Sequence, residues 1–283
     1  MFSWARLFAM LAVSLGGVMK VAVAGATGRM GQAIIGAVLR SPGLVLSGAL
    51  TRPGSAVCGR DAGLLVGTRA IGLAVSDGPA AVIAGCDVLI DFSQPQASLE
   101  YAELCADLGK PAVIGTTGFT TEALERLRAL SRQVALVVAA NMSVGVTLAL
   151  HLLAIAARVT AEADVEIFEA HHRHKRDAPS GTALRMGEVV AQARGRSLRD
   201  VAVYDRHGDR AERVPGTIGF ASVRAGEIVG EHRVFMALPA ERLEIAHIAE
   251  SRDVFAEGAL RAARFVRTQA PGLFDMQDVL GLR

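Results

Sequence analysis

The chain has few cysteines and no cysteine pattern of the kind that builds a stable site. Its three cysteines, Cys58, Cys86 and Cys105, are odd in number and form no CxxC pair. The missing pairs exclude the usual zinc-binding spacings, and the low, odd count argues against a fold held together by disulfides. We therefore expect a cytoplasmic protein that keeps its thiols reduced.

Net charge is also low, at +2, and no long run of Lys or Arg occurs. The sequence therefore offers no electrostatic support for a nucleic-acid partner. Basic residues gather mainly at Arg173–Arg176, and so local a cluster suggests a small anionic ligand. With 51% hydrophobic and 20% charged residues over 283 positions, the composition is that of a globular protein with one large or two modest domains.

The first 18 residues contain one Arg followed by the apolar run Leu7–Leu15. This run resembles a weak secretory signal, and it is too short to span a bilayer. A strand starting at Met19 leads directly into a glycine loop, so signal cleavage would leave no spacer before the fold. We expect Met19 to be the true start, residues 1–18 to lie outside the fold, and no membrane partner. A packed or disordered extension and an export signal are the alternatives.

What the sequence does contain is an alternation of short apolar runs and amphipathic stretches from residue 19 to residue 142. The run Val21–Ala24 ends at a glycine and precedes a helical pattern at 29–39. This alternation predicts an α/β fold with a Rossmann-type, doubly wound parallel sheet. Further strands are expected at 44–50, 88–90, 112–114 and 134–138, helices at 96–108 and 121–131, and an irregular loop at 52–70.

The pattern changes after residue 142. A long apolar helix is expected at 144–159, then a strand at 165–169, a charged loop and a helix at 182–193. Several strands follow, which predicts a second, α+β domain over residues 143–251 for substrate binding and oligomerisation. A last helix at 255–266 is expected to return to the dinucleotide-binding domain, which then comprises 19–142 and 252–283. The later strands are expected at 219–223, 227–229, 234–237 and 243–246.

A glycine loop follows the first expected strand, with the spacing GxxGxxG from Gly25 to Gly31. Small residues let the backbone approach a pyrophosphate, and the following helix offers free N–H groups and the positive end of its dipole. A tight turn without a ligand is the alternative. The residues expected to bind the cofactor here are Gly25, Ala26, Thr27, Gly28, Arg29 and Met30.

The second expected strand ends without the carboxylate that binds the ribose hydroxyls of NAD. Thr51 and Arg52 stand there instead. A hydroxyl and a guanidinium can pair with a 2′-phosphate, so we predict a preference for NADPH, with NADH also possible. The alternative is that Arg52 is an ordinary solvated charge.

Two more loops follow expected strands, and ligands of a parallel sheet bind outside the carboxyl ends of its strands. Their small, hydroxyl and amide residues suit contacts with a nicotinamide or a ribose, although simple turn chemistry would use the same residues. The expected cofactor residues of these loops are Gly115, Thr116, Thr117, Ala139, Ala140, Asn141 and Met142.

Polar chemistry is densest between Glu166 and Ala183, where three of the seven histidines fall within four positions. Histidine suits acid–base work near neutral pH, and Lys175 can supply a cation or a proton. The segment 177–182 is typical of a helix start, whose proline and hydroxyl residues suit the first turn and whose N–H groups can hold a carboxylate.

An anionic substrate site is the favoured interpretation of this segment. A metal site built from His171, His172 and His174 is disfavoured, because the basic neighbours would repel a cation. A purely solvated charged loop is the other alternative. We expect no metal here.

The segment, written E-I-x-E-x-H-H-x-H-K-x-D-A-P-S-G-T-A, resembles the signature of dihydrodipicolinate reductases. The motifs V-A-V-A-G-A-T-G-R-M-G, D-F-S-Q-P, G-T-T-G-F, A-A-N-M-S-V-G-V, V-P-G-T-I-G-F-A-S-V-R-A-G-E-I-V-G-E-H and G-L-F-D-M agree with that family from about Met19 to Leu280. The resemblance implies hydride transfer from NAD(P)H to C4 of a cyclic dicarboxylate in lysine and diaminopimelate biosynthesis. It also implies a homotetramer formed through the second domain.

Carried over by motif position, the resemblance makes His171 the acid–base residue and Lys175 the proton donor. Two departures from the family pattern matter: Thr51 replaces an acid, which puts NADH use in doubt, and Met142 replaces an aromatic residue beside the nicotinamide. The residues implied to bind the substrate carboxylates are His172, Lys175, Ser180, Gly181 and Thr182.

Two other functions share the glycine loop. One is a two-domain dehydrogenase acting on an amino acid such as aspartate, which would not need the His- and Lys-rich segment. The other is a non-catalytic NADPH-binding sensor, which would not need His171 or Lys175. An assay of NADPH oxidation with the dicarboxylate substrate separates all three.

Overall fold

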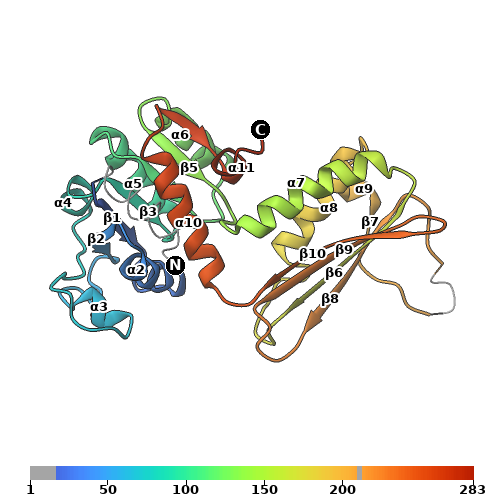
Figure 1. Ribbon diagram of the computed structural model, residues 1–283, viewed down its shortest axis with the longest axis horizontal. Helices are drawn as coiled ribbons and strands as arrows, with labels where there is room; N and C mark the ends of the chain where they lie inside the picture. Colours follow the sequence, from blue (N-terminus) through green and yellow to red (C-terminus); the bar gives the residue numbers. More distant parts are fainter. Residues whose placement is uncertain (1–16, 209–211) are drawn as a thin grey trace, which may run out of the picture. The chain divides into compact units, whose positions relative to one another are not determined.

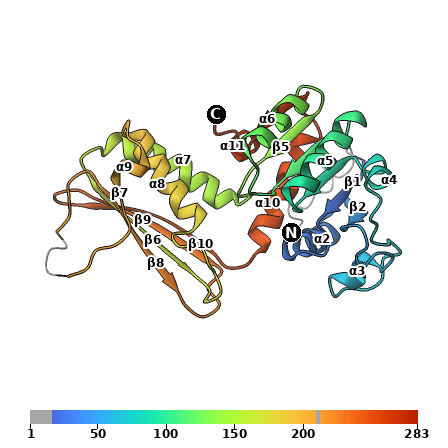
Figure 2. The same ribbon diagram turned by 180° about the vertical axis from the view of Figure 1, so that it is seen from behind.

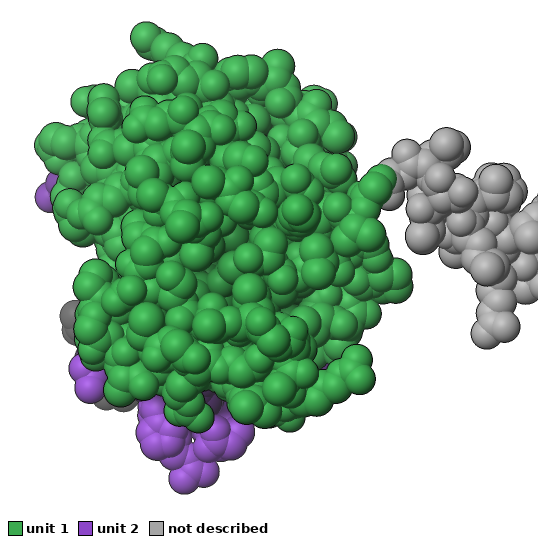
Figure 3. Space-filling view, turned by 90° about the vertical axis from the view of Figure 1, so that its left-hand side faces the viewer, with its two compact units in different colours: residues 1–142, 255–283 green, residues 143–254 purple. Residues whose placement is uncertain are grey.

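The computed structural model describes residues 17–208 and 212–283, which divide into two compact units (Figure 3). One unit comprises the described residues up to Met142 together with Phe255–Arg283, and the other is Ser143–Val254. The boundary at which the chain returns to the first unit was expected after residue 251 and lies after Val254, inside a helix. The expectation that residues 1–18 are an extension outside the fold concerns mainly residues 1–16. These lie outside the described residues.

The first unit is built on a six-stranded parallel sheet in the order β11-β5-β4-β3-β1-β2. The order reverses between β1 and β3, which is the switch point at which doubly wound sheets bind ligands. Its central strands are almost wholly buried, as their unbroken apolar runs predict. The strands are β1 (Met19–Ala24), β2 (Leu44–Leu50), β3 (Val88–Asp91), β4 (Ala112–Ile114), β5 (Ala135–Val138) and β11 (Gly272–Phe274).

Helices flank this sheet, as the alternating pattern predicts (Figure 1). The loop expected at 52–70 contains one short helix, and a second short helix follows it. Both were missed because four- and six-residue helices carry too few periodic positions. The helices are α2 (Arg29–Arg40), α3 (Ala62–Leu65), α4 (Pro79–Ala84), α5 (Pro95–Asp107), α6 (Thr121–Leu130), α10 (Asp253–Val266) and α11 (Met276–Leu280).

The second unit is a five-stranded mixed sheet in the order β10-β9-β6-β8-β7. Helices α7 (Val144–Val159) and α8 (Gly181–Ala193) lie over one face of it and leave the other face uncovered (Figures 1 and 2). The α/β fold with a second α+β domain is thereby confirmed. The remaining elements are β6 (Asp164–His171), α9 (Leu198–Val201), β7 (Ala202–Val203), β8 (Ile218–Arg224), β9 (Gly230–Ala237) and β10 (Arg242–Ala249).

The strand expected at 227–229 is wrong. These residues form a turn in which Gly226 has φ +49°, and the chain then passes across the end of β6 to enter β9 on its far side. Backbone bonds hold this crossing: Ala225 N–H donates to the carbonyl of His171 at 2.9 Å, and Arg173 N–H donates to that of Gly226 at 3.2 Å. Ile228 and Val229 are β-branched, so the sequence at this position resembles a strand, but these residues do not pair with a neighbouring strand.

The helix-covered face of this sheet has two halves with different chemistry. One half is apolar and packs under α7 and α8, with Val165, Ile167, Val234 and Met236 fully buried. The other half is a polar row, in which Ser222, Glu169, His232 and His247 are register neighbours on successive strands. Since side chains alternate between the faces of a strand, the same face carries both halves.

Among residues 17–208 and 212–283, no helix is long enough and apolar enough to cross a membrane.

Candidate active site

In the first unit, four strand-end loops line a cavity of about 470 Å³. The loops follow β1, β3, β4 and β5, whose carboxyl ends meet at the switch point. Of the expected cofactor residues, those that line the cavity are Gly28, Arg29, Met30, Gly115, Thr116, Thr117, Ala140 and Met142. Four residues that were not among the expected cofactor residues also line it, three of them from the D-F-S-Q-P motif: Phe92, Ser93, Gln94 and Phe255.

Close approach of backbone segments explains the glycines of the first loop. Gly25 has φ +76°, a conformation that residues with a side chain rarely adopt, and a Cβ at Gly31 would overlap the carbonyl oxygen of Gly25. Helix α2 has Gly28 as its N-cap, so it begins without a side-chain cap, and its first turn contains no acidic residue. The helix therefore presents backbone N–H groups and the positive end of its dipole, which suits a pyrophosphate.

Thr116 reaches the cavity but directs its hydroxyl at a buried carboxylate. Its Oγ1 lies 3.2 Å from Asp91 Oδ2 and 2.7 Å from the Ser98 hydroxyl, which itself donates to Asp91. Burial raises the pKa of Asp91, although hydrogen bonds from Ser93, Ser98 and Thr116 oppose the rise. The network positions the loops after β3 and β4 against one another.

The other expected cofactor residues lie behind or beside the cavity. Ala26 is buried and donates its N–H to the carbonyl of Leu50 at 2.9 Å, which holds the glycine loop to the end of β2. Thr51 is buried with no hydrogen-bond partner for its hydroxyl, and Arg52 is exposed next to it. Gly25, Thr27, Ala139 and Asn141 also do not line the cavity.

In the second unit, His171 ends β6 and is held by a buried carboxylate. Its Nδ1 lies 2.6 Å from Glu169 Oε2, and Arg224 binds both oxygens of Glu169, at 2.9 and 2.8 Å. The Glu169 carboxylate fixes the imidazole with Nδ1 as the donor, so the neutral ring keeps its lone pair on Nε2. Nε2 faces Gly230, at which a Cβ would stand 3.1 Å away.

The charges of this trio follow from burial and pairing. Burial alone would raise the pKa of Glu169, but hydrogen bonds from Arg224, Ser222 and His171 outweigh it and hold the pKa below its ordinary value. Burial lowers the pKa of His171, the bond to Glu169 raises it, and the charges of Lys175 and Arg224 lower it further, with a net lowering. The imidazole is therefore neutral near pH 7 and able to accept a proton.

The loop after His171 carries the remaining expected substrate residues. Lys175 Nζ lies 2.9 Å from Asp177 Oδ1, so the expected proton donor is held in an ion pair. His172 is half-buried, and its Nδ1 is buried without a partner. His174 stands beside it, with 6.2 Å between ring centroids. No three His, Cys, Asp or Glu side chains within the described ranges are placed to hold a metal ion.

Helix α8 begins where this loop ends, at Gly181 rather than at the proline. Ser180 is its N-cap, and the Ser180 hydroxyl accepts the N–H of Ala183 at 3.2 Å. Ser180 N–H donates to Glu169 Oε1 at 3.3 Å, and its hydroxyl lies 2.8 Å from His232 Nε2. Ser180 is 2% exposed, so its side chain serves the helix cap, while Gly181 is exposed at the surface of the helix start.

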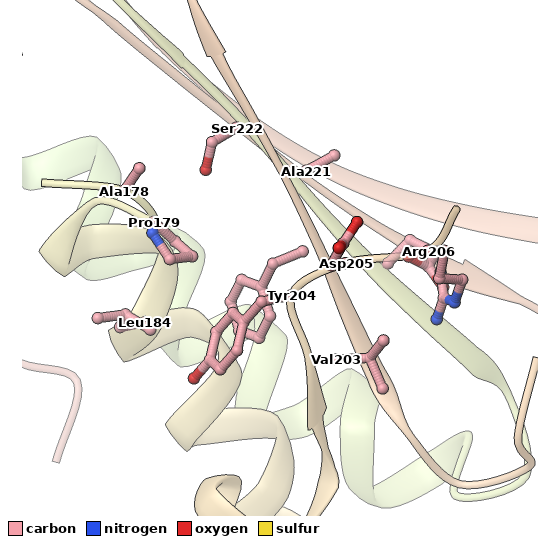
Figure 4. Close-up of a pocket in the computed structure, with 11 residues that line it drawn as sticks. Ala178, Pro179, Leu184, Val203, Tyr204, Asp205, Arg206, Ala221 and Ser222 are labelled. Atoms are coloured by element: carbon pink, nitrogen blue, oxygen red, sulfur yellow. The ribbon is translucent and has the colours of Figure 1, made fainter. Parts of the chain in front are cut away.

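A second cavity, of about 710 Å³, lies beside the end of this loop (Figure 4). Its walls are Ala178 and Pro179 of the loop, Ser222 of β8, and the tilted ring pair of Tyr204 and Phe220, with centroids 5.2 Å apart. None of its lining residues is His171, His172 or Lys175. This cavity is therefore not formed by the residues expected to move protons or bind the substrate.

Both parts of the chain match the models of one protein family. The model for the N-terminal part of dihydrodipicolinate reductase matches residues 19–142, and the model for its C-terminal part matches residues 145–280.

The chain belongs to the dihydrodipicolinate reductase family.

Curated relatives agree over nearly the full length of the reductase. The 4-hydroxy-tetrahydrodipicolinate reductase of Nitrosospira multiformis is 54% identical, with 94% of this chain and 98% of the relative covered. The enzyme of the same name from Methylococcus capsulatus is 55% identical, with 94% and 99% covered. The resemblance found in the sequence motifs is thereby confirmed, and a dehydrogenase of another family is excluded.

Among solved structures, the dipicolinate-bound dihydrodipicolinate reductase from Paenisporosarcina sp. TG-14 shares the fold. Its TM-score is 0.74 at 24% identity, with 92% of this chain and 98% of that chain covered. Both the parallel sheet of the first unit and the mixed sheet of the second are therefore typical of this family.

Three residues of the second unit were not predicted as site residues: Glu169, Arg224 and His232. All three stand inside motifs that carry the resemblance, but they come from different strands. Only the register of β6 with β8 and β9 brings them to His171. A charged residue between apolar neighbours in an expected buried strand, as Glu169 is between Phe168 and Ala170, is the sequence signal that could have identified one of them.

Proposed function

We propose that the reductase converts 4-hydroxy-tetrahydrodipicolinate to tetrahydrodipicolinate in lysine and diaminopimelate biosynthesis. The chain is an oxidoreductase of its family, and NAD(P)H supplies the hydride that reaches C4 of the substrate ring. One proton is taken up and water leaves, so the reaction balances. The observation that supports this most is the buried Glu169–His171 pair at the end of β6, beside a helix start able to bind a carboxylate.

The first unit has the features that a dinucleotide requires. The uncapped start of α2 would hold the pyrophosphate, and Gly115 leaves room at its loop because a Cβ there would overlap the ring of Phe92. The loops after β4 and β5, with Thr117, Ala140 and Met142, would hold the nicotinamide and its ribose. The orphaned hydroxyl of Thr51 fits a ligand that supplies a partner for it.

In the second unit, we assign the substrate carboxylates to the N–H groups of Gly181 and Thr182, to His172 and to Lys175. The α8 dipole and the Lys175 ammonium both favour a dianion, and the unpartnered Nδ1 of His172 gains a partner when a ligand binds. Ser180 contributes as the cap of α8. The Lys175 ammonium donates the proton, and His171, with its Nε2 lone pair, accepts and returns protons during loss of water.

Cofactor choice rests on Thr51 and Arg52. No carboxylate follows β2 to repel a 2′-phosphate, and Arg52 is exposed and available to pair with one. We therefore propose NADPH as the preferred cofactor, with NADH used less well. The ratio of kcat/KM values for the two cofactors measures this preference.

We also propose a cytoplasmic homotetramer formed through the uncovered face of the five-stranded sheet. That face carries Phe168, Phe235 and Ile248 around a hollow of about 290 Å³, bordered by the charged side chains of Glu231 and Arg233. Apolar side chains on a solvent-facing sheet are typical of a face that pairs with another copy. Sedimentation equilibrium would measure the assembly. The three free thiols fit a reducing compartment.

A coupled assay tests the activity. Dihydrodipicolinate synthase, pyruvate and aspartate semialdehyde generate the substrate, and the reductase is then added with NADPH. The expected result is oxidation of NADPH that requires the synthase, pyruvate and aspartate semialdehyde as well as the reductase. Oxidation no faster than with the synthase alone would contradict the proposed activity and leave the NADPH-binding sensor as the better explanation.

A further inference from the structure

We propose that His232 is a positioning residue: one neutral imidazole that holds both the acid–base His171 and the carboxylate-binding start of α8. The inference rests on the substrate site proposed above. On this proposal, His232 contacts neither substrate nor cofactor. The role of His232 is to set the distance between His171 Nε2, which moves a proton, and the N–H groups at the start of α8, which bind the substrate carboxylate.

His232 touches both elements of the site. It lies on β9, directly across from Glu169 of β6, and it is 5% exposed. Its ring meets that of His171 edge-on, with centroids 5.1 Å apart and an interplanar angle of 73°. Its Nε2 lies 2.8 Å from the Ser180 hydroxyl, which caps α8. Since one rigid ring makes both contacts, a shift at one neighbour is felt at the other.

The hydrogen-bond pattern indicates which form of the imidazole is present. His232 Nδ1 is buried without a partner. Its Nε2 shares a hydrogen bond with the Ser180 hydroxyl, so a neutral ring needs no further partner for a second N–H. A charged ring would carry an N–H on both nitrogens, and the N–H at Nδ1 would be buried without an acceptor. Burial, aided by the neighbouring His171, His247 and Lys175 and opposed by the charge of Glu169, lowers the pKa of His232 to about 4, which agrees with a neutral ring.

The sheet offers a matched control on the next strand. His247 of β10 is the register neighbour of His232, and its Nε2 lies 3.3 Å from the hydroxyl of Ser143, the N-cap of α7. Its Nδ1 is likewise buried without a partner. Each histidine thus supports a serine-capped helix start, but only His232 also packs against His171.

The test measures kcat and the inhibition constant of dipicolinate, a planar dicarboxylate, for His232→Leu, His232→Gln, Ser180→Ala, the double variant His232→Leu/Ser180→Ala and His247→Leu. Because a small misplacement of reacting groups is costly, His232→Leu should lower kcat and weaken dipicolinate, each by about 10-fold or more. Ser180→Ala should weaken dipicolinate and should lower kcat less than His232→Leu does, because the packing of His232 on His171 remains. His232→Gln keeps a donor near the Nε2 position and should recover most of both values.

Two further results separate positioning from simple stability. The double variant should bind dipicolinate no more weakly than the weaker single variant, because both changes break one interaction. His247→Leu should lower the unfolding midpoint as His232→Leu does, yet leave kcat and dipicolinate inhibition within about 2-fold of the parent. If the losses of dipicolinate affinity in the two single variants multiplied in the double variant, the inference would be overturned. It would also be overturned if kcat and dipicolinate inhibition changed no more in His232→Leu than in His247→Leu.

A last variant distinguishes failure of this inference from failure of the site. His172→Ala removes a side chain assigned to the substrate carboxylates and leaves His232 unchanged. If His172→Ala weakens dipicolinate and His232→Leu does not, the positioning role of His232 is wrong and the substrate site stands. If neither variant weakens it, the substrate site is wrong as well.

Discussion

Helices α2 and α8 each begin at a loop that follows a strand, and each is proposed to hold an anion, yet the two helix starts are built differently. The start of α2 has glycines at Gly25, Gly28 and Gly31 and no side-chain cap. The start of α8 has a serine cap supported by buried His232 and Glu169. On this proposal, the first would hold a phosphate mainly with backbone, while the second would add side chains that can move protons.

The difference follows from the task of each site. A cofactor phosphate needs close approach and a fixed dipole, so the absence of side chains suffices. A substrate that takes up a proton needs groups whose charge is controlled, and burial with pairing controls it at Glu169, His171 and His232. We therefore expect the second unit to be sensitive to charge and pH, and the first to be sensitive to side-chain volume.

The largest expected effect is on the buried ion pair of the second unit. Arg224→Met leaves the Glu169 carboxylate, 1% exposed, without its bidentate partner. We expect the free energy of unfolding to fall by about 3–5 kcal/mol, measured by urea denaturation at pH 7. The control is Arg126→Met, which breaks an exposed pair with Glu103 and should cost less than about 1 kcal/mol. Equal losses would show that Glu169 does not depend on Arg224.

Next in size is the chemical step. Lys175→Ala should lower kcat at least roughly 10²-fold, equivalent to about 2.7 kcal/mol, because the proton donor is lost. The dissociation constant of NADPH, measured by fluorescence titration, should hardly change, since the glycine loop lies in the other unit. Arg176→Ala, an exposed cation of the same loop, should keep its turnover. Unchanged turnover in Lys175→Ala would remove Lys175 from the mechanism.

A smaller effect is expected in the pH dependence of stability. The pKa of His232 is about 4 in the folded chain and near 6.5 when exposed, so the unfolded chain binds the extra proton between these values. Folded stability therefore rises with pH through this window and falls on acidification. Between pH 7 and pH 5, the parent should lose about 2 kcal/mol more than His232→Gln, as urea denaturation at both values would measure. Glu169, His171 and His247 are present in both proteins, so their titration contributes to both losses of unfolding free energy and drops out when one loss is subtracted from the other. Parallel losses would mean that His232 titrates normally.

The smallest effect concerns the first unit. Arg52→Ala should raise the KM for NADPH while leaving that for NADH nearly unchanged, so the NADPH preference should fall by about 10-fold, or about 1.4 kcal/mol. Arg60→Ala is the control, because Arg60 is an exposed arginine of the same loop region. Steady-state kinetics with both cofactors gives the ratio. A parent enzyme that prefers NADH would contradict the role given to Thr51 and Arg52.

Local patterns allowed much of this chain to be predicted. Helix α7 has the expected bounds, and β1 with its glycine loop lies where the apolar run and the glycine spacing place it. These elements follow from neighbouring residues in the sequence, which is why periodicity and turn chemistry suffice. The short helices α3 and α4 and the turn at 227–229 were missed or misassigned, because too few residues, or no pairing strand, separate the alternatives.

The sequence by itself determined which chemical groups this reductase has, and the family motifs indicated their roles. Only the tertiary structure decided that Glu169, Arg224 and His232 act together with His171, because the register of β6 with β8 and β9 places residues far apart in the chain on one face. The structure also decided that Lys175 is paired with Asp177 and that the Ser180 hydroxyl caps α8. Charge state depends on burial and on partners, and both are properties of the packed sheet rather than of the sequence.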